Sequence, residues 1–143
     1  MKKIILVTLV SVSLFSFAAC AQKIAAAQVP AVVKTSFSKD FPGITSKWEK
    51  EKANYEASFK QNGNMMSALY DASGNKIESE MDIKISTLPA AITTYITQHY
   101  KGEKIKEAAI ITKANGEVNY EAEVKGMDLL FTKKGKFIKS VKD

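Results

Sequence analysis

The chain repeats itself, and this repeat constrains its fold more than any other feature. Three segments of the first half return in the same order in the second half, between 59 and 65 positions later. They are residues 29–33 (VPAVV) and 88–92 (LPAAI), residues 54–59 (NYEASF) and 119–124 (NYEAEV), and residues 70–77 (YDASGNKI) and 131–138 (FTKKGKFI). Such a repeat predicts one structural unit built twice, with the units stacked so that they bury their apolar faces together.

Each copy opens with a pattern typical of a helix. Pro30 and Pro89 stand at the start, where a helix does not need the N–H that proline lacks. Pro42-Gly43 and Gly102 mark the ends of these helices. Apolar residues recur between them at four-residue spacing, as on one face of a helix. They are Val29, Val33 and Phe37 in the first copy and Leu88, Ile92 and Ile96 in the second.

Each helix is followed by strand patterns. Tyr55, Ala57 and Phe59 alternate with polar residues, which is typical of a half-buried strand. Glycine- and asparagine-rich turns separate the patterns, and tight turns join antiparallel strands. The predicted strands are 44–52, 54–60, 65–71 and 76–83 in the first copy, and 104–113, 117–125, 127–132 and 136–142 in the second.

These elements predict an α+β fold. Each unit is one helix followed by a four-stranded antiparallel meander, and the repeats span residues 29–83 and 88–142. Two such units can join edge to edge into a continuous antiparallel sheet with both helices packed on one face. The short linker between them lacks a flexible Gly/Pro/Ser run, so we expect residues 29–143 to form a single domain.

The N-terminus is typical of an export signal. Lys2 and Lys3 precede an apolar stretch that ends in small residues, so we expect residues 1–21 to be a signal peptide. Two cleavage sites compete. The A-x-A pattern gives a mature start at Gln22, whereas a lipobox-like pattern gives a lipidated Cys20, which would be the only attachment to a membrane. Residues 22–28 are alanine-rich and are expected to be a tether.

Composition excludes several classes of protein. The one cysteine lies in the signal region, so the expected domain has no disulfide, and its stability must come from an apolar core. All 21 basic residues are lysine, against 15 acidic residues. Arginine is the usual bidentate ligand of phosphate and guanine, so this chain is a poor candidate for binding nucleic acid.

No pattern in the chain predicts catalysis, a metal site or a cofactor. His99 is the only histidine, without a second histidine or a cysteine in the domain, and is expected at the surface of a helix end. The segment 71–75 (DASGN) lacks the spacing of a calcium loop and is expected to be a turn. The pairs Glu49/Glu51 and Glu121/Glu123 are expected to face solvent, where nothing would raise a carboxyl pKa.

The strand register points instead to one face of the sheet. If Met66, Ala68 and Tyr70 and their counterparts 127, 129 and 131 face the helices, the alternate residues face away. This placement puts three apolar side chains on the side without helices: Met65, Leu69 and Leu130. An exposed apolar patch often marks a binding surface, and methionine adapts to irregular partners. Trp48 has no clear register, because its counterpart strand contains no aromatic residue.

These motifs resemble one known family. A Val/Leu-Pro pair before an amphipathic helix, then the segments 41–43 (FPG), Trp48, 55–59 (YEASF) and 70–74 (YDASG), is similar to the PepSY-like, beta-lactamase-inhibitor-like exported proteins of Bacteroidota. The resemblance covers residues 29 to about 141. It implies helix-plus-sheet repeats, a periplasmic or outer-membrane-associated location and no enzymatic activity. The family name suggests inhibition by docking a target on the sheet face.

We therefore expect a non-enzymatic exported binding module of the bacterial cell envelope. Its partner would be an envelope protein or peptide that docks on the open sheet face. The alternative is a periplasmic module that binds a small ligand or a metal ion.

Processing near Cys20 or Ala21 is the first testable prediction. Intact-mass measurement of the protein from its native envelope is expected to show either a start at Gln22 or a diacylglycerol mass on Cys20. A retained segment from Met1 to Ala21 in that fraction would contradict both cleavage sites.

Overall fold

The computed structural model describes residues 21–142. Residues 1–20 of the expected signal peptide, among them the proposed lipidation site Cys20, lie outside the described residues.

Two α-helices and nine strands make up the described chain. Strand β1 (Gln22–Ile24) and a short 3-10 helix, η1 (Ala26–Gln28), precede α1 (Ala31–Asp40). The first half continues with β2 (Ser46–Glu51), β3 (Asn54–Gln61), β4 (Asn64–Tyr70) and β5 (Lys76–Asp82). A second 3-10 helix, η2 (Ile85–Thr87), leads to α2 (Ala90–His99). The second half follows with β6 (Ile105–Lys113), β7 (Val118–Val124), β8 (Met127–Thr132) and β9 (Phe137–Lys142).

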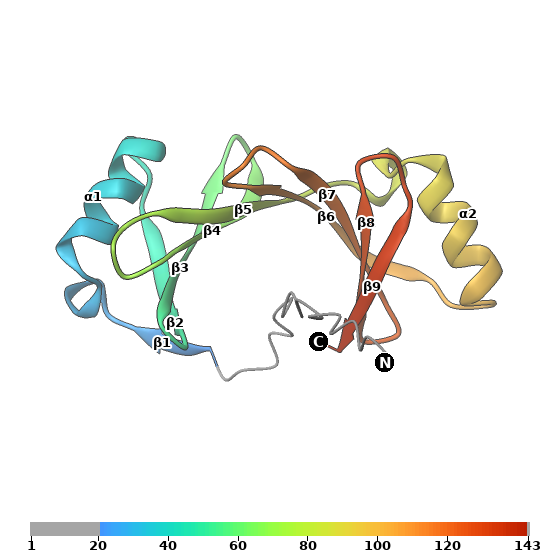
Figure 1. The fold of residues 1–143 in the computed structure, drawn as a ribbon, viewed down its shortest axis with the longest axis horizontal. Helices are drawn as coiled ribbons and strands as arrows, with labels where there is room; N and C mark the ends of the chain where they lie inside the picture. The colour runs from blue at the N-terminus through green and yellow to red at the C-terminus, as the bar shows by residue number, and fades with distance from the viewer. Residues whose placement is uncertain (1–20, 143) are drawn as a thin grey trace, which may run out of the picture.

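All nine strands form one antiparallel sheet in chain order, β1 to β9. The halves are joined by β5 and β6, which pair from Glu78 opposite Lys113 to Asp82 opposite Ala109. Figure 1 shows the sheet curved into an arch, with α1 and α2 at opposite ends on its outer side. The inner side of the arch carries no helix among residues 21–142.

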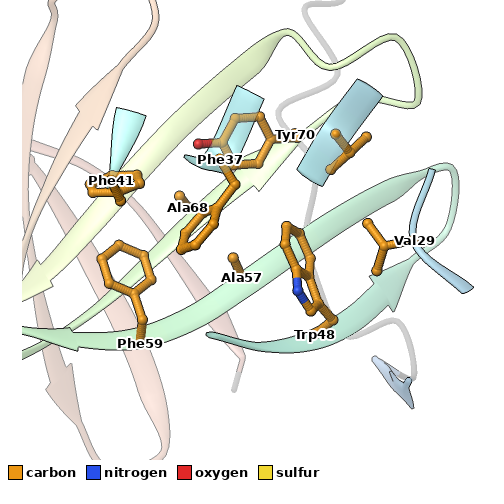
Figure 2. Close-up of a cluster of buried hydrophobic side chains, with 9 residues drawn as sticks. Val29, Phe37, Phe41, Trp48, Ala57, Phe59, Ala68 and Tyr70 are labelled. Atoms are coloured by element: carbon orange, nitrogen blue, oxygen red, sulfur yellow. The ribbon is translucent and has the colours of Figure 1, made fainter. Parts of the chain in front are cut away.

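The first core lies between α1 and strands β2 to β4. Phe37 of α1 is 4% exposed and contacts three aromatic rings edge-on, with centroids 5.5 Å away for Trp48, 5.2 Å for Phe59 and 6.5 Å for Tyr70. Figure 2 shows these side chains gathered under the helix above Ala57 and Ala68, which are fully buried. Small residues on the central strands let the large rings of the helix approach the sheet closely.

The second core repeats this arrangement under α2. Ile92 and Ile96 pack on Ala122, Leu129 and Phe131, and all five are at most 2% exposed. Half-buried residues surround them, including Tyr120 from β7 and the pair Tyr95 and Phe137, whose rings stack at 4.8 Å. Ile92 thus corresponds to Val33 of α1, and Ile96 takes the place of the aromatic Phe37.

The end of α1 is tied to the sheet by polar contacts. The Tyr70 hydroxyl donates to Asp40 Oδ2 at 2.9 Å, and Lys76 Nζ lies 3.4 Å from the same oxygen. Burial and the Asp40 carboxylate both raise the Tyr70 pKa, so the phenol remains a donor.

The α+β class, the antiparallel sheet and both helices agree with the sequence prediction, and the eight predicted strands are correct within two residues at each end. Residues 22–28 are not a tether. Gln22–Ile24 pair with β2 and place Ile24 opposite Trp48, where it packs against the first core. Trp48 is buried on the helix side of the sheet.

Gly135 supplies a stability prediction. It has a φ of +80° in the β8–β9 turn, and an added Cβ would lie 2.7 Å from the Cβ of Ala91 in α2. Gly116 has a φ of +82°, but an added Cβ there meets nothing within 4 Å. Gly116→Ala is therefore expected to cost only the left-handed backbone penalty, about 1–2 kcal/mol. Gly135→Ala is expected to cost clearly more, because α2 must also move.

Chemical denaturation of the two variants measures this difference. Equal losses of unfolding free energy would show that α2 accommodates the added Cβ at Gly135 without further cost.

Candidate functional site

The face of the sheet opposite the two helices, called here the open face, is the candidate site. Residues directly opposite each other on neighbouring strands share a face, so the register assigns every position. One row across the open face runs Ser58, Ser67, Glu80, Ile111, Asn119 and Thr132 from β3 to β8. Another row runs Glu56, Leu69, Glu78 and Lys113 from β3 to β6.

A groove of about 500 Å³ lies on this face and spans β5 to β9. Aliphatic side chains form one part of its lining: Ile77, Ile111, Leu130, Ile138 and Val141. Polar and charged side chains form the rest: Glu78, Glu80, Lys113, Glu117, Asn119, Glu121, Asp128, Lys139 and Lys142. We call this the central groove. An adjoining pocket of about 150 Å³ is lined by six carboxylates: Glu80, Asp82, Glu107, Glu121, Glu123 and Asp128.

Two β-bulges shape the central groove. The register shifts between Leu69 and Tyr70 where β4 meets β5, and between Leu130 and Phe131 where β8 meets β9. Each shift leaves one isoleucine outside the regular pairing, Ile77 in β5 and Ile138 in β9, and both line the groove. They remain 36% and 38% exposed. Bulges re-aim side chains in this way.

Asn119 is the one buried polar residue of the described chain, at 2% exposed. Its Nδ2 donates to Glu117 Oε1 at 3.1 Å, while its Oδ1 has no hydrogen-bond partner within residues 21–142. Buried polar atoms are nearly always paired, and an unpaired one costs about 1–3 kcal/mol. Asn119 also lines the central groove, so this unpaired acceptor belongs to a residue of the candidate site.

Burial and crowding raise the pKa of three carboxyls on the open face, Glu51, Glu78 and Glu80. The Glu80 pKa is raised to about 7, first by burial and then by the charges of Glu56, Asp82, Glu78 and Asp128. The Glu51 pKa is also raised to about 7, by burial and by its neighbour Glu56. The expectation that nothing raises a carboxyl pKa in the Glu49/Glu51 pair is therefore wrong for Glu51, because Glu56 stands opposite Glu49 on the neighbouring strand and close to Glu51.

The three apolar residues expected on the open face do lie there by register, but their exposure differs. Met65 is 49% exposed at the end of β4, outside the central groove. Leu130 is half-buried and lines the groove. Leu69 is only 7% exposed, so the expectation of an exposed Leu69 is wrong. Its cross-strand neighbours, Glu56 and Glu78, flank it on the inner side of the arch.

Other residues singled out in the sequence have the expected structural roles. His99 is exposed at the end of α2, where Nδ1 lies 2.9 Å from the Tyr95 carbonyl oxygen and the ring stacks on Tyr95. Asp71 Oδ1 accepts hydrogen bonds from the backbone N–H groups of Ser73 and Asn75, which makes segment 71–75 a turn. These contacts hold the pKa of Asp71 below its usual value, led by the bond from the Asn75 side chain.

Simple alternation of strand residues could not reveal Ile77, Ile138, Glu80 or Asn119. The two isoleucines follow bulges, which alternation does not anticipate. The sequence did contain one signal for them, because Ile77 and Ile138 occupy the same place in the repeated segments 70–77 and 131–138. The burial of Asn119 and Glu80 depends on the curvature of the sheet and has no local signal.

The described chain contains neither a membrane-spanning helix nor a metal-binding cluster of the usual kind. No helix among residues 21–142 is both long enough and apolar enough to cross a bilayer. Within the same range, histidine, cysteine and carboxylate side chains form no group of three or more arranged to hold a metal ion.

A family model covers most of the sequence. The family described as "Putative beta-lactamase-inhibitor-like, PepSY-like" matches residues 18–75 and again residues 53–139. None of the curated proteins matches the chain.

Several solved structures share the fold. A DUF2874 family protein from Bacteroides uniformis is 20% identical with a TM-score of 0.70, and the match covers 78% of this chain and 87% of that one. A BLIP-like protein from Bacteroides fragilis is 23% identical with a TM-score of 0.65, over 78% and 84% of the two chains. A protein of Bacteroides eggerthii described as "putative periplasmic" is 20% identical with a TM-score of 0.68, over 78% and 87%.

Glu80→Gln is expected to stabilise the protein at high pH only. A folded-state pKa near 7, above the ordinary 4.5, means that folding disfavours the charged carboxylate. Stability is therefore complete below about pH 4.5 and is lost as the pH rises through 7. The amide avoids this loss, so the variant is expected to gain about 1–3 kcal/mol at pH 8 and nothing at pH 4.5.

Urea denaturation at the two pH values checks this expectation. The exposed residue Glu103 provides the matched control, because Glu103→Gln removes the same charge outside the groove. A gain for Glu80→Gln that is equal at both pH values would show that its carboxyl does not titrate as described.

Proposed function

Because the chain belongs to the PepSY-like, beta-lactamase-inhibitor-like family, we propose that it is a non-enzymatic exported binding module of the bacterial cell envelope. It engages a protein or peptide through the open face of its sheet. The fold relatives described as periplasmic and BLIP-like support the location and the inhibitor-like role. The expected signal segment 1–21 would direct export, and a lipid on Cys20 would anchor the module.

The central groove is the observation that carries this proposal. Both helices cover the outer side of the arch, so within residues 21–142 one whole face of the sheet carries no helix. On that face the bulges place Ile77 and Ile138 as exposed apolar residues beside the half-buried Leu130. Apolar side chains that stay exposed at the rim of a groove, without a role in the core, favour a docking role.

The residue chemistry favours binding over catalysis. The only histidine stacks on Tyr95 at the end of α2, a position that does not line the groove. The groove offers carboxylates, one amide and lysines, and lacks the nucleophile–base pair that acyl or phosphoryl transfer requires. The volume of the groove lies in the range of small-ligand sites, about 300–1,000 Å³. The experiment must therefore distinguish a protein partner from a small ligand.

We further propose that the two halves are copies of one unit. The bulges at Leu69/Tyr70 and Leu130/Phe131 occupy equivalent places in the repeated segments, and each half packs one helix on its strands. Strand β1 is then an addition to the first copy.

Two isoleucines allow a matched test of docking. Ile138 lines the groove and Ile85 lies in η2 away from it, and both are 38% exposed. Ile138→Ser is expected to reduce capture of an envelope partner by about tenfold or more, since apolar anchors in an interface carry much of its energy. Ile85→Ser is expected to leave capture unchanged.

The measurement is affinity capture from the native envelope, with the processed protein and both variants as bait and thermal unfolding as a control. Equal capture by both variants would remove the open face as the docking surface. A retained small molecule, identified by native mass spectrometry in place of any protein, would support the small-ligand alternative.

A further inference from the structure

The centre of the groove is an array of hydrogen-bond acceptors around an apolar floor. Glu80 and Asn119 stand directly opposite Ile111, one on each neighbouring strand, about 4.8 Å away across the sheet. Glu121 follows Asn119 by two residues on β7 and stands opposite Leu130. Two aliphatic side chains thus lie beside two carboxylates and an amide oxygen.

The orientation of the Asn119 amide is fixed by its neighbour. An ionised carboxylate only accepts hydrogen bonds, so the nitrogen of the amide must face Glu117. The bonds from Asn119 and Lys113 hold the Glu117 pKa below its ordinary value, which keeps this group ionised. The buried Asn119 oxygen is therefore left as an acceptor, and no described residue donates to it.

The distribution of charge also favours a cationic ligand on the open face. The chain is basic, with a net charge of +6, but strand alternation places nine carboxylates and five lysines on the open face. The carboxylates are Glu49, Glu51, Glu56, Glu78, Glu80, Asp82, Glu121, Glu123 and Asp128, and the lysines are Lys23, Lys47, Lys60, Lys113 and Lys139. The groove and the adjoining pocket add Glu107, Glu117 and Lys142. An acidic surface of this kind attracts cations and repels anions.

We infer that the central groove takes the cationic side chain of an arginine or lysine from the docked segment. Its aliphatic stem lies on Ile111 and Leu130, and its N–H groups donate to Asn119 Oδ1, Glu80 and Glu121. Long basic side chains bury their stems on apolar surface in this manner, and the planar guanidinium supplies several donors in a fixed geometry. This inference rests on the proposed docking function and specifies the chemistry of the partner.

A cationic side chain fits this groove better than a metal ion or an anion does. A hard cation would need several oxygens converging on one point, and residues 21–142 contain no such group. An anion would meet more carboxylates than lysines, because five carboxylates line the groove against Lys113, Lys139 and Lys142. The buried Asn119 oxygen would offer it an acceptor in place of a donor.

Two blocked pentapeptides test the inference directly. Acetyl-Gly-Val-Arg-Val-Gly-amide carries the cation, and the same peptide with citrulline in place of arginine keeps its shape without the charge. In an NMR titration of the labelled protein, the arginine peptide is expected to shift the Asn119 side-chain amide saturably. The citrulline peptide is expected to bind at least about tenfold more weakly, since it loses the charge-assisted hydrogen bonds.

Variants separate the groove from general charge. Asn119→Leu and Glu80→Gln are each expected to weaken binding of the arginine peptide about tenfold, the usual loss for a hydrogen bond to a charged group. Glu103→Gln removes one negative charge from an exposed loop and is expected to change affinity less than about twofold. Glu80→Gln keeps the test decisive if Asn119→Leu folds poorly.

Equal affinity for the arginine and citrulline peptides would overturn the inference, as would affinities that neither groove variant changes. Neither result affects the test of docking, in which Ile138→Ser loses partner capture. Docking on the open face would then stand, and only the cationic side chain of the partner would be rejected. Loss of discrimination in both groove variants, with Glu103→Gln unaffected, would support the inference.

Discussion

The pairing of β5 with β6 determines the rest of the architecture. These strands come from different halves, and their register, with Met81 opposite Ile110, makes the helix-side residues of one half continuous with those of the other. A slip of one residue would turn every side chain of the second half to the opposite face. The helices would then cover opposite sides of the sheet, and no uncovered face would remain. The groove depends on this pairing directly, because Glu78 opposite Lys113 and Glu80 opposite Ile111 line it.

Both faces of the sheet bury side chains, but by different means. On the outer side, α1 and α2 cover two separate cores that are nearly all apolar. On the inner side the curvature of the arch and the two bulges bring strands closer, so Leu69, Ile111 and Asn119 are buried without any helix above them. This second kind of burial includes carboxylates and one amide, and it produces the raised Glu80 pKa and the unpaired Asn119 oxygen.

Local patterns in the sequence predicted what depends on local physics. Helix stripes, prolines and turn glycines placed both helices and eight strands, because these signals act over a few residues. Strand β1 was missed because three residues, Gln22–Ile24, are too few for a pattern, and their pairing with β2 is a tertiary event. For the site, alternation placed Leu130 correctly by face, but it misjudged the exposure of Leu69. It could not find Ile77 and Ile138, whose positions depend on bulges, or the burial of Glu80 and Asn119, which depends on curvature.

The net charge of the chain is positive, whereas the candidate site is acidic. Lysine predominates in the chain, yet the register collects carboxylates on the inner face, where Glu80 meets the field of Glu56, Asp82, Glu78 and Asp128. Crowding like charges and leaving a buried oxygen unpaired both lower stability. A cationic donor in the groove would relieve both costs at once, since it neutralises the carboxylates and satisfies Asn119. The features that weaken the free protein are therefore the ones that would strengthen its complex with a basic partner.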